Sequence, residues 1–363
     1  MIIQKLVDFL NQSFPPALQE DYDNTGLLTG NPDEELSGVL LTVDVTEEVV
    51  EEAVDKNVNF ILAHHPLIFK GLKSLTGKNH IERTVIKAIQ NGIAIYAAHT
   101  NLDNAHNGVN FKLAKKLGLE NTAILQPFKD ELVKLVFFVP HEHANTVREA
   151  VFAAGAGKIG EYDACSYNLD GQGSFRPGEG TDPFVGEKGK LHFEPETRVE
   201  TIMPRYLTSK VVKAMIEAHP YEEVAYDLYP LLNEYNQAGS GMIGTLKNAV
   251  PEDEFLSLLK EKFNAQCIKY TSFDKPIQTV AICGGSGSFL LSKAISSGAD
   301  AFITADLKYH QFFDAEDKIL LADIGHFESE EVTKEIFYEL LTEKFHNFAI
   351  HLSDINTNPI NYY

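Results

Sequence analysis

The sequence predicts an α/β fold that is split by an inserted domain. Short apolar runs alternate with helical patterns over the first third of the chain and again over its last third. This alternation is typical of a parallel sheet covered by helices on both faces. The middle of the chain instead follows the order βαββαβ, which is that of a ferredoxin-like unit. We therefore predict a split α/β/α body at residues 1–128 and 238–363, with residues 129–237 inserted.

The first third begins with an amphipathic helical pattern at residues 1–10, followed by an apolar strand at residues 38–45. Thr46 has the residue type and the position of an N-cap for a helix over residues 46–56. Further strands are expected at residues 60–63 and 93–98, and further helices at residues 81–91 and 109–117, which are followed by Gly92 and Gly118. Glycine just after a helical pattern favours the end of the helix.

The inserted segment contains four strand patterns and two helical ones. Strands are expected at residues 132–140, 162–169, 190–203 and 224–231, and helices at residues 145–154 and 209–218. A glycine-rich stretch at residues 171–189 separates the middle strands, and the polar, glycine-rich residues 235–244 are expected to form the return linker. The last third predicts helices at residues 252–263, 289–296 and 332–345, and strands at residues 279–282, 301–304, 319–322 and 348–351.

Composition narrows the class of protein. The chain has 363 residues, 44% of them apolar, and no run approaches the roughly 20 apolar residues of a membrane span. Residues 1–10 do not resemble a signal peptide. The three cysteines, Cys165, Cys267 and Cys283, are far apart, which favours a reducing cytoplasm and argues against a thiolate zinc site. A formal net charge of −21 repels phosphate backbones and argues against nucleic-acid binding.

Polar side chains follow three of the apolar strands. Residues 59–66 read Asn-Phe-Ile-Leu-Ala-His-His-Pro, so that strand ends on His64 and His65. The strand at residues 93–98 leads to His99 and Asp103, and the strand at residues 319–322 leads to His326 and Glu330. His326 and Glu330 are four residues apart, so on a helix they share a face. Because ligands bind at the carboxyl ends of strands in open α/β sheets, the three ends together predict a metal site. The alternative for the His-His pair alone is a capped strand with two hydrogen-bonded histidines.

Three imidazoles and two carboxylates suit zinc, iron, manganese or nickel. Five ligands exceed what one catalytic zinc normally takes from protein, so two divalent ions are expected, with Asp103 or Glu330 as a bridge. Such a pair activates water and polarises a substrate oxygen, which is hydrolase chemistry suited to anionic substrates. Successive side chains of a strand point to opposite faces. His64 and His65 can therefore serve one centre only if the chain bends, or if they bind different ions.

Weaker signals surround these five residues. His99 is a candidate for proton transfer or for orienting a ligand. Asp306 or His310 could lie at the rim of the pocket, although a helix N-cap and a surface histidine explain them equally well. The glycine-rich residues 283–288 follow a strand and could cradle phosphate or form a plain tight turn. We interpret the histidines of the inserted domain as ordinary turn residues: His141, His143 and His219.

Three motifs resemble a known family. They are His-His-Pro-Leu-Ile-Phe at residues 64–69, His-Thr-Asn-Leu-Asp at residues 99–103 and Gly-His-Phe-Glu-Ser-Glu at residues 325–330. The sequence is similar here to the family named after a yeast NGG-interacting factor, whose bacterial members are labelled dinuclear metal centre proteins or GTP cyclohydrolase I type 2 homologues. The inserted domain, with His-Pro-Tyr-Glu-Glu at residues 219–223, looks like the PII-like or CutA-like domain of longer members.

The resemblance implies two divalent ions held by His64, His65, Asp103, His326 and Glu330. It also implies a homohexamer, a dimer of trimers, and hydrolysis of GTP or another nucleotide. His99 and Asp306, singled out by their positions above, are the candidate catalytic residues, and the cysteine usage places the protein in the cytoplasm. Ala305-Asp306 departs from the glycine-plus-acid pair of the family, which affects substrate selection more than metal binding. The alternative function is a non-catalytic metal-binding regulator that senses an effector through the PII-like domain.

Overall fold

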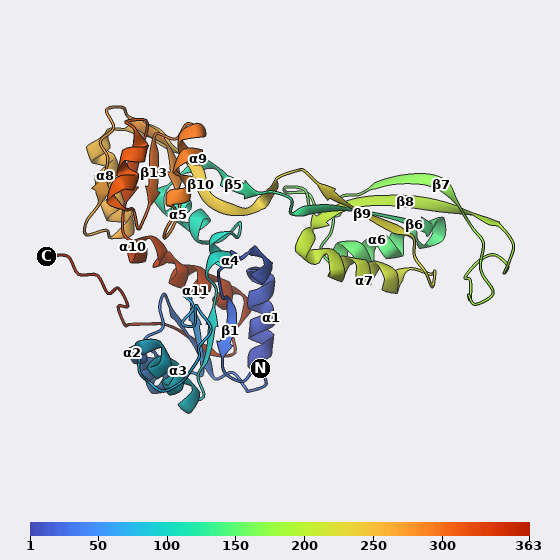
Figure 1. Cartoon of the computed structure of the whole chain (residues 1–363), viewed down its shortest axis with the longest axis horizontal. Helices are drawn as coiled ribbons and strands as arrows, with labels where there is room; N and C mark the ends of the chain where they lie inside the picture. The colour runs from blue at the N-terminus through green and yellow to red at the C-terminus, as the bar shows by residue number, and fades with distance from the viewer. The chain divides into compact units, whose positions relative to one another are not determined.

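The computed structural model describes residues 1–363 and divides into two compact units. Unit 1 comprises Met1–Gln126 and Ala238–Tyr363, and unit 2 comprises Pro127–Gln237 (Figure 1). The chain therefore leaves unit 1 once, forms unit 2 and returns. None of the helices combines the length and the apolar character needed to cross a bilayer.

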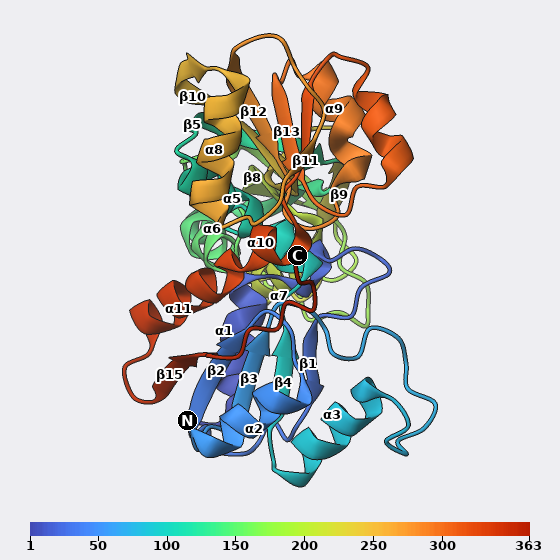
Figure 2. The same ribbon diagram turned by 90° about the vertical axis from the view of Figure 1, so that its left-hand side faces the viewer.

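The first sheet of unit 1 has five strands in the order β1-β4-β3-β2-β15. Strand β1 pairs antiparallel with β4, and all other pairs are parallel. The strands are β1 (Gly26–Thr29), β2 (Gly38–Thr42), β3 (Phe60–Ala63), β4 (Ala94–Ala97) and β15 (Ala349–Leu352). Helices α1 (Ile3–Ser13) and α11 (Val332–Lys344) pack on one face, and α2 (Glu47–Asp55) and α3 (His80–Gln90) pack on the other (Figure 2).

Alternation of side chains along these strands explains why helices cover both faces. Leu41 and Leu62 pack with the core that contains α1 and α11, whereas Leu40 and Ile61 pack with α2 and α3. All four side chains are fully buried. The Thr46 side chain accepts a hydrogen bond from the Val49 backbone N–H, so the predicted N-cap is confirmed.

The second sheet of unit 1 has six strands in the order β11-β14-β13-β12-β10-β5. Its centre is parallel, whereas β10 pairs antiparallel with β12 and β11 pairs antiparallel with β14. The strands are β5 (Glu120–Phe128), β10 (Tyr235–Val250), β11 (Lys269–Tyr270), β12 (Ile277–Ile282), β13 (Ala301–Thr304) and β14 (Leu320–Asp323). Helices α5 (Val109–Leu117) and α8 (Glu252–Phe263) cover one face, and α9 (Leu291–Ser296) with short 3₁₀ turns at Ser288–Leu290 and Tyr309–Ala315 covers the other.

Unit 2 is a four-stranded antiparallel sheet in the order β7-β8-β6-β9. Its strands are β6 (Leu132–Pro140), β7 (Tyr167–Phe175), β8 (His192–Pro204) and β9 (Tyr226–Leu231). Helices α6 (Ala144–Ala153) and α7 (Thr208–Ala218) pack on one face, and their core includes Phe137, Val199 and Met215. Only one face of this sheet is covered by helices.

Two predictions about glycine-rich segments were wrong. Residues 235–244 are not a linker but the first part of β10, and β7 continues to Phe175 inside the predicted glycine-rich stretch. Gly244 explains the first error, because a Cβ there would lie 3.0 Å from the carbonyl oxygen of Glu120 on the neighbouring strand β5. The glycine permits close pairing of the two strands, whereas in the sequence it resembles a loop residue. Strands β1, β5 and β11 were not predicted.

Candidate metal centre

Three strand ends deliver the predicted ligands to one place in unit 1. Strand β3 leads to His64 and His65, and β4 leads to His99 and the short helix α4 (Thr100–Asp103). Strand β14, in the second sheet, leads to α10 (His326–Glu330), with Gly325 at the turn. Gly325 has a φ of 96°, which an L side chain rarely adopts. Figure 2 shows α10 between the two sheets, so both sheets contribute to the site.

The Glu330 carboxylate lies at the middle of this cluster. Its Oε2 is 2.8 Å from His65 Nε2 and 2.9 Å from His326 Nε2, and these two nitrogens are 3.2 Å apart. On the other side, Glu330 Oε1 is 3.7 Å from His64 Nε2, and Asp103 Oδ1 is 3.6 Å from the same nitrogen. All five predicted residues therefore converge.

The chain bends at the His-His pair, which resolves the geometric difficulty of two successive side chains. The backbone N–H groups of His64 and His65 both donate to the carbonyl oxygen of Val43, at 3.1 and 2.9 Å. A regular parallel strand would not direct two successive N–H groups to one acceptor. The bend leaves the two ring centroids 4.9 Å apart on the same side of the chain.

Each histidine of the cluster is held through Nδ1. His64 Nδ1–H donates to the carbonyl oxygen of Ala98 at 2.8 Å. The same nitrogen of His65, His99 and His326 contacts a carboxylate at 2.7, 2.8 and 2.8 Å, from Asp44, Asp23 and Asp306 respectively. A proton on Nδ1 leaves Nε2 as the ligating atom, the arrangement common in metal sites. The alternative of hydrogen-bonded histidines explains the Nδ1 contacts but leaves the buried His64 Nε2 without a partner.

Two buried polar atoms of the cluster have no hydrogen-bond partner: His64 Nε2 and Asp103 Oδ1. Burial raises the pKa of the Asp103 carboxyl, and the nearby Glu330 charge raises it further. Burial lowers the pKa of His64, so its Nε2 stays free of a proton. Unpaired buried donors and acceptors are costly. Nitrogen and oxygen ligands in this arrangement therefore fit divalent cations.

His65 and His326 are the cationic residues that offset the carboxylates. Burial opposes their charge, but hydrogen bonds to Asp44 and Glu330 outweigh it and raise the pKa of His65 to about 10. The corresponding bonds to Asp306 and Glu330 outweigh burial for His326 and raise its pKa to about 11. Bound divalent cations would replace these protons, since a ligating imidazole is neutral.

His99 and Asp306, the two weaker candidates, lie on different sides of the cluster. The His99 ring centroid is 5.3 Å from that of His64 and 5.4 Å from that of His65, and its Nε2 makes no hydrogen bond. Asp306 contacts the outer nitrogen of His326, which places it behind a ligand candidate. His310 packs its ring against Tyr309 and Phe313.

Two aspartates accept hydrogen bonds from histidines of the cluster, and the sequence did not predict this role for them. Asp44 follows β2 at the same sheet end as His64, and Asp23 precedes β1. The Asp23 carboxylate is buried, yet bonds from His99 and Thr100 outweigh burial and lower its pKa to about 2. Position after a strand end was the available signal for Asp44. Asp23 could be singled out only as part of a turn, because its partner His99 is distant in the sequence.

The loop at residues 283–288 is a tight turn against the cluster. The N–H groups of Gly284, Gly285 and Gly287 donate to side chains of Asn110, Ser329 and Thr304, so they are not free to cradle a phosphate. Gly285 has a φ of 57°, and a Cβ there would lie 2.1 Å from Glu330 Oε1. The glycine thus makes room for the central carboxylate.

Replacement of Asp44 or Asp306 by asparagine is expected to lower the affinity for divalent metal by about 10- to 100-fold, because each carboxylate fixes the orientation and basicity of a histidine. Competition with a chromophoric chelator measures this affinity. The exposed Asp33→Asn variant is the control and should bind as the unmodified chain does. Wild-type affinity in both the Asp44 and the Asp306 variants would contradict the orienting role.

Comparison with known proteins gives one consistent result. The family model described as Duf34/NIF3 (NGG1p interacting factor 3) matches residues 1–359. Relatives named GTP cyclohydrolase 1 type 2 homolog are 40% identical in Halalkalibacterium halodurans and 39% identical in Bacillus subtilis, each aligned over 99% of this chain and 98% of the relative. A Bacillus cereus protein related to NIF3 has a crystal structure with a TM-score of 0.88 and 38% identity, covering 100% of this chain and 99% of that one. A Staphylococcus aureus protein of solved structure has a TM-score of 0.79 and 30% identity, covering 100% of this chain and 99% of that one.

Proposed function

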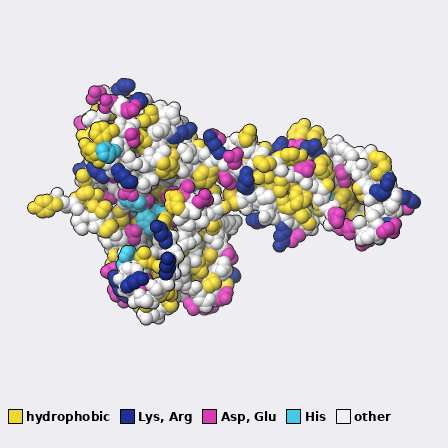
Figure 3. All heavy atoms as spheres, in the orientation of Figure 1, with side chains coloured by type: hydrophobic (Ala, Val, Ile, Leu, Met, Phe, Trp, Pro, Cys, Tyr) yellow, Lys and Arg dark blue, Asp and Glu magenta, His cyan; other side chains and the backbone are white.

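The chain belongs to the Duf34/NIF3 family, and from that premise we propose that it is a metal-dependent hydrolase of a nucleotide-like or other phosphorylated substrate. The observation that carries the proposal is the convergence of His64, His65, Asp103, His326 and Glu330, with buried polar atoms that have no partner within the protein. Figure 3 shows histidine side chains gathered at the surface over the region of α10, so a substrate could reach them.

We assign two divalent ions to the cluster, with Glu330 as the bridging residue. Its Oε2 faces His65 and His326, whereas its Oε1 faces His64, which is also the neighbour of Asp103. This arrangement separates the ligands into two groups that share one carboxylate. It favours Glu330 over Asp103 as the bridge. When bound, such a pair of ions supplies an activated water and polarises a substrate oxygen.

His99 is the residue that we assign to proton transfer. Asp23 holds its Nδ1, and a ring nitrogen of His99 is within 4.8 Å of ring nitrogens of His64 and His65. An imidazole oriented by a carboxylate is a suitable general acid or base. His99 would then accept a proton at Nε2 while Asp23 stabilises the resulting charge.

Two aromatic side chains beside His99 favour a substrate that carries an aromatic ring. Phe69 lies 6.3 Å from His99 and 6.2 Å from Tyr22, measured between ring centroids. Both rings are partly solvent exposed, Tyr22 by 64% and Phe69 by 40%. Exposed aromatic faces stack on nucleobases. Because relatives are named GTP cyclohydrolase 1 type 2 homolog, GTP is the first nucleotide to test.

The test is turnover by protein purified without oxygen and reloaded separately with zinc, iron, manganese or nickel. We expect at least one metal form to hydrolyse GTP or a related nucleotide. Chromatography of the products measures this hydrolysis. The His346→Gln variant, which removes an exposed histidine, should keep full activity. Failure of every metal form to convert any of these nucleotides would reject the hydrolase.

We also propose that unit 2 is a ferredoxin-like, PII/CutA-type insertion. Its strand order β7-β8-β6-β9 and its two helices on one face support this assignment. A non-catalytic metal-binding regulator with effector sensing through unit 2 is the second candidate function. The cavity on the other face of that sheet favours it.

A further inference from the structure

Unit 2 contains a cavity of about 610 Å³ that is separate from the metal-binding cluster. It lies over the sheet face that no helix covers, since its lining residues Phe138, Glu196 and Arg198 alternate with Phe137 and Val199, which face the helices. The loop at residues 176–185 and residues 221–225 form the remaining walls. The volume is within the range of about 300–1,000 Å³ that is usual for small-molecule sites.

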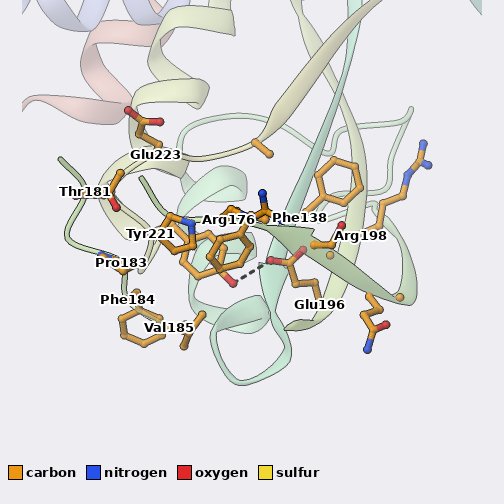
Figure 4. A pocket seen from close by; sticks show the side chains of 18 of the residues that line it. Phe138, Arg176, Thr181, Pro183, Phe184, Val185, Glu196, Arg198, Tyr221 and Glu223 are labelled. Carbon is orange, nitrogen blue, oxygen red and sulfur yellow. Dashed lines mark hydrogen bonds between the residues drawn. The ribbon is translucent and has the colours of Figure 1, made fainter. Parts of the chain in front are cut away.

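Aromatic rings form much of the cavity wall. Phe175, Phe184 and Tyr221 lie close together, with ring centroids 5.9 Å apart between Phe175 and Tyr221 and 6.2 Å apart between Phe184 and Tyr221. Phe138 contributes a fourth ring from the sheet (Figure 4). The space between such rings suits a flat aromatic ligand, which gains from stacking as well as from burial.

One buried carboxylate faces this space. Glu196 is only 7% exposed, and its Oε1 accepts a hydrogen bond from the Tyr221 hydroxyl at 2.9 Å (Figure 4). Its Oε2 lies over Gly173, where a Cβ would approach it to 2.2 Å. The nearest cation along the strand, Arg198, pairs with Glu200 at 2.9 Å instead. Glu196 thus has an acceptor oxygen without a charged partner.

The backbone next to Tyr221 is fixed by His219. The His219 Nε2–H donates to the carbonyl oxygen of Phe138 at 2.9 Å, and its Nδ1 accepts the Tyr221 backbone N–H at 3.1 Å. His219 lies just after α7 and is 7% exposed, so it is a buried, hydrogen-bonded residue of this turn. It joins two walls of the cavity and holds Tyr221 toward Glu196.

Charge and hydrogen bonding restrict the ligand. The residues that line the cavity carry four carboxylates and only two guanidinium groups. The carboxylates belong to Asp170, Glu196, Glu222 and Glu223, and the guanidinium groups to Arg176 and Arg198. A phosphorylated ligand is therefore disfavoured. The acceptor oxygen of Glu196 has no charged partner, because Arg198 pairs with Glu200. An aromatic ring that carries an amino group supplies a donor for this oxygen.

We propose that this cavity is a binding site for a neutral or cationic heteroaromatic amine, the chemical class of the amino-bearing nucleobases. Glu196 accepts from the amino group, and Tyr221 and Phe175 stack on the ring. The site is distinct from the metal-binding cluster, and ligand binding here does not depend on the proposed hydrolysis.

Calorimetry on the full-length chain, freed of metal by a chelator, tests the proposal with adenosine, cytidine and uridine as probes. Adenosine or cytidine should bind, and uridine, which has no amino group, should bind more weakly by at least about tenfold. Glu196→Gln should lower the affinity for the bound nucleoside by about 10- to 100-fold, because a hydrogen bond to a buried charge is lost. Gly173→Ala should act in the same way, since it displaces the carboxylate without removing it.

Two control variants show whether the nucleoside binds in this cavity. Glu194→Gln alters a carboxylate on the same strand that does not line the cavity and should leave the affinity unchanged. His326→Ala should also leave it unchanged, because it affects only the metal-binding cluster. Absence of binding by both adenosine and cytidine at millimolar concentration would overturn the proposal, as would equal affinity in the Glu196 variant or loss of binding in the His326 variant. Thermal unfolding of each variant shows whether it is folded.

Discussion

Glu330→Gln is expected to remove both divalent ions from the protein. Glu330 is the only residue of the cluster that contacts His64, His65 and His326 together. An amide cannot bridge two cations with two charged oxygens, and its NH₂ group would face His Nε2 atoms or a metal. Metal analysis after anaerobic purification, followed by titration with zinc, should show that the affinity for metal falls by more than about 100-fold. This loss is larger than the loss expected when a residue that only orients a ligand is replaced.

The variants around Glu330 make this experiment specific. Gly285→Ala should have nearly the same effect, because its Cβ would occupy the place of the Glu330 carboxylate. Asp103→Asn should lose at most one ion, since Asp103 lies next to His64 alone among the ligating histidines. Glu328→Gln, on the same helix, should retain both ions. A Glu330→Gln protein with two ions at wild-type affinity would refute the bridging assignment, and loss of both ions from Asp103→Asn would transfer that role to Asp103.

Much of the fold could be predicted because its helices and strands have strong local patterns. The strand at residues 60–63 and the helix capped by Thr46 are examples, since an apolar run and a cap are both visible within a few residues. Strand β10 could not be predicted in this way. Its glycines lower strand propensity, and the close approach of β5 that requires Gly244 exists only in the folded protein.

The metal-binding cluster was likewise predictable where local sequence patterns determine it and not where distant parts of the chain meet. The approach of His64, His65 and Asp103 follows from the rule that carboxyl ends of adjacent parallel strands meet at one edge. The approach of α10 to these residues depends on how a second sheet packs, and the spacing of His326 and Glu330 gave only an indication of it. The contacts of Asp23, Asp44 and Asp306 with histidines could not be predicted, because each joins two residues that are distant in the sequence.

His99→Gln is expected to lower turnover by about 10²- to 10⁴-fold, the usual contribution of a general acid or base, while both ions remain bound. His99 has an imidazole that Asp23 orients through Nδ1, and its Nε2 makes no hydrogen bond. Glutamine keeps the size and polarity of the side chain but cannot carry the proton. Metal content and the rate of nucleotide hydrolysis, measured on the same preparation, provide the two readouts.

The two readouts distinguish the possible roles of His99. Because a ring nitrogen of His99 is within 4.8 Å of ring nitrogens of His64 and His65, His99 could also complete the coordination of one ion. In that case His99→Gln would lose one ion together with activity, whereas a proton-transfer residue leaves two ions and an inactive protein. Asp23→Asn should also lower the rate of hydrolysis, but by less than His99→Gln does. The substitution weakens the orientation of the His99 imidazole and leaves the imidazole in place. Full activity of the His99 variant would assign proton transfer to another group and leave His99 a structural partner of Asp23.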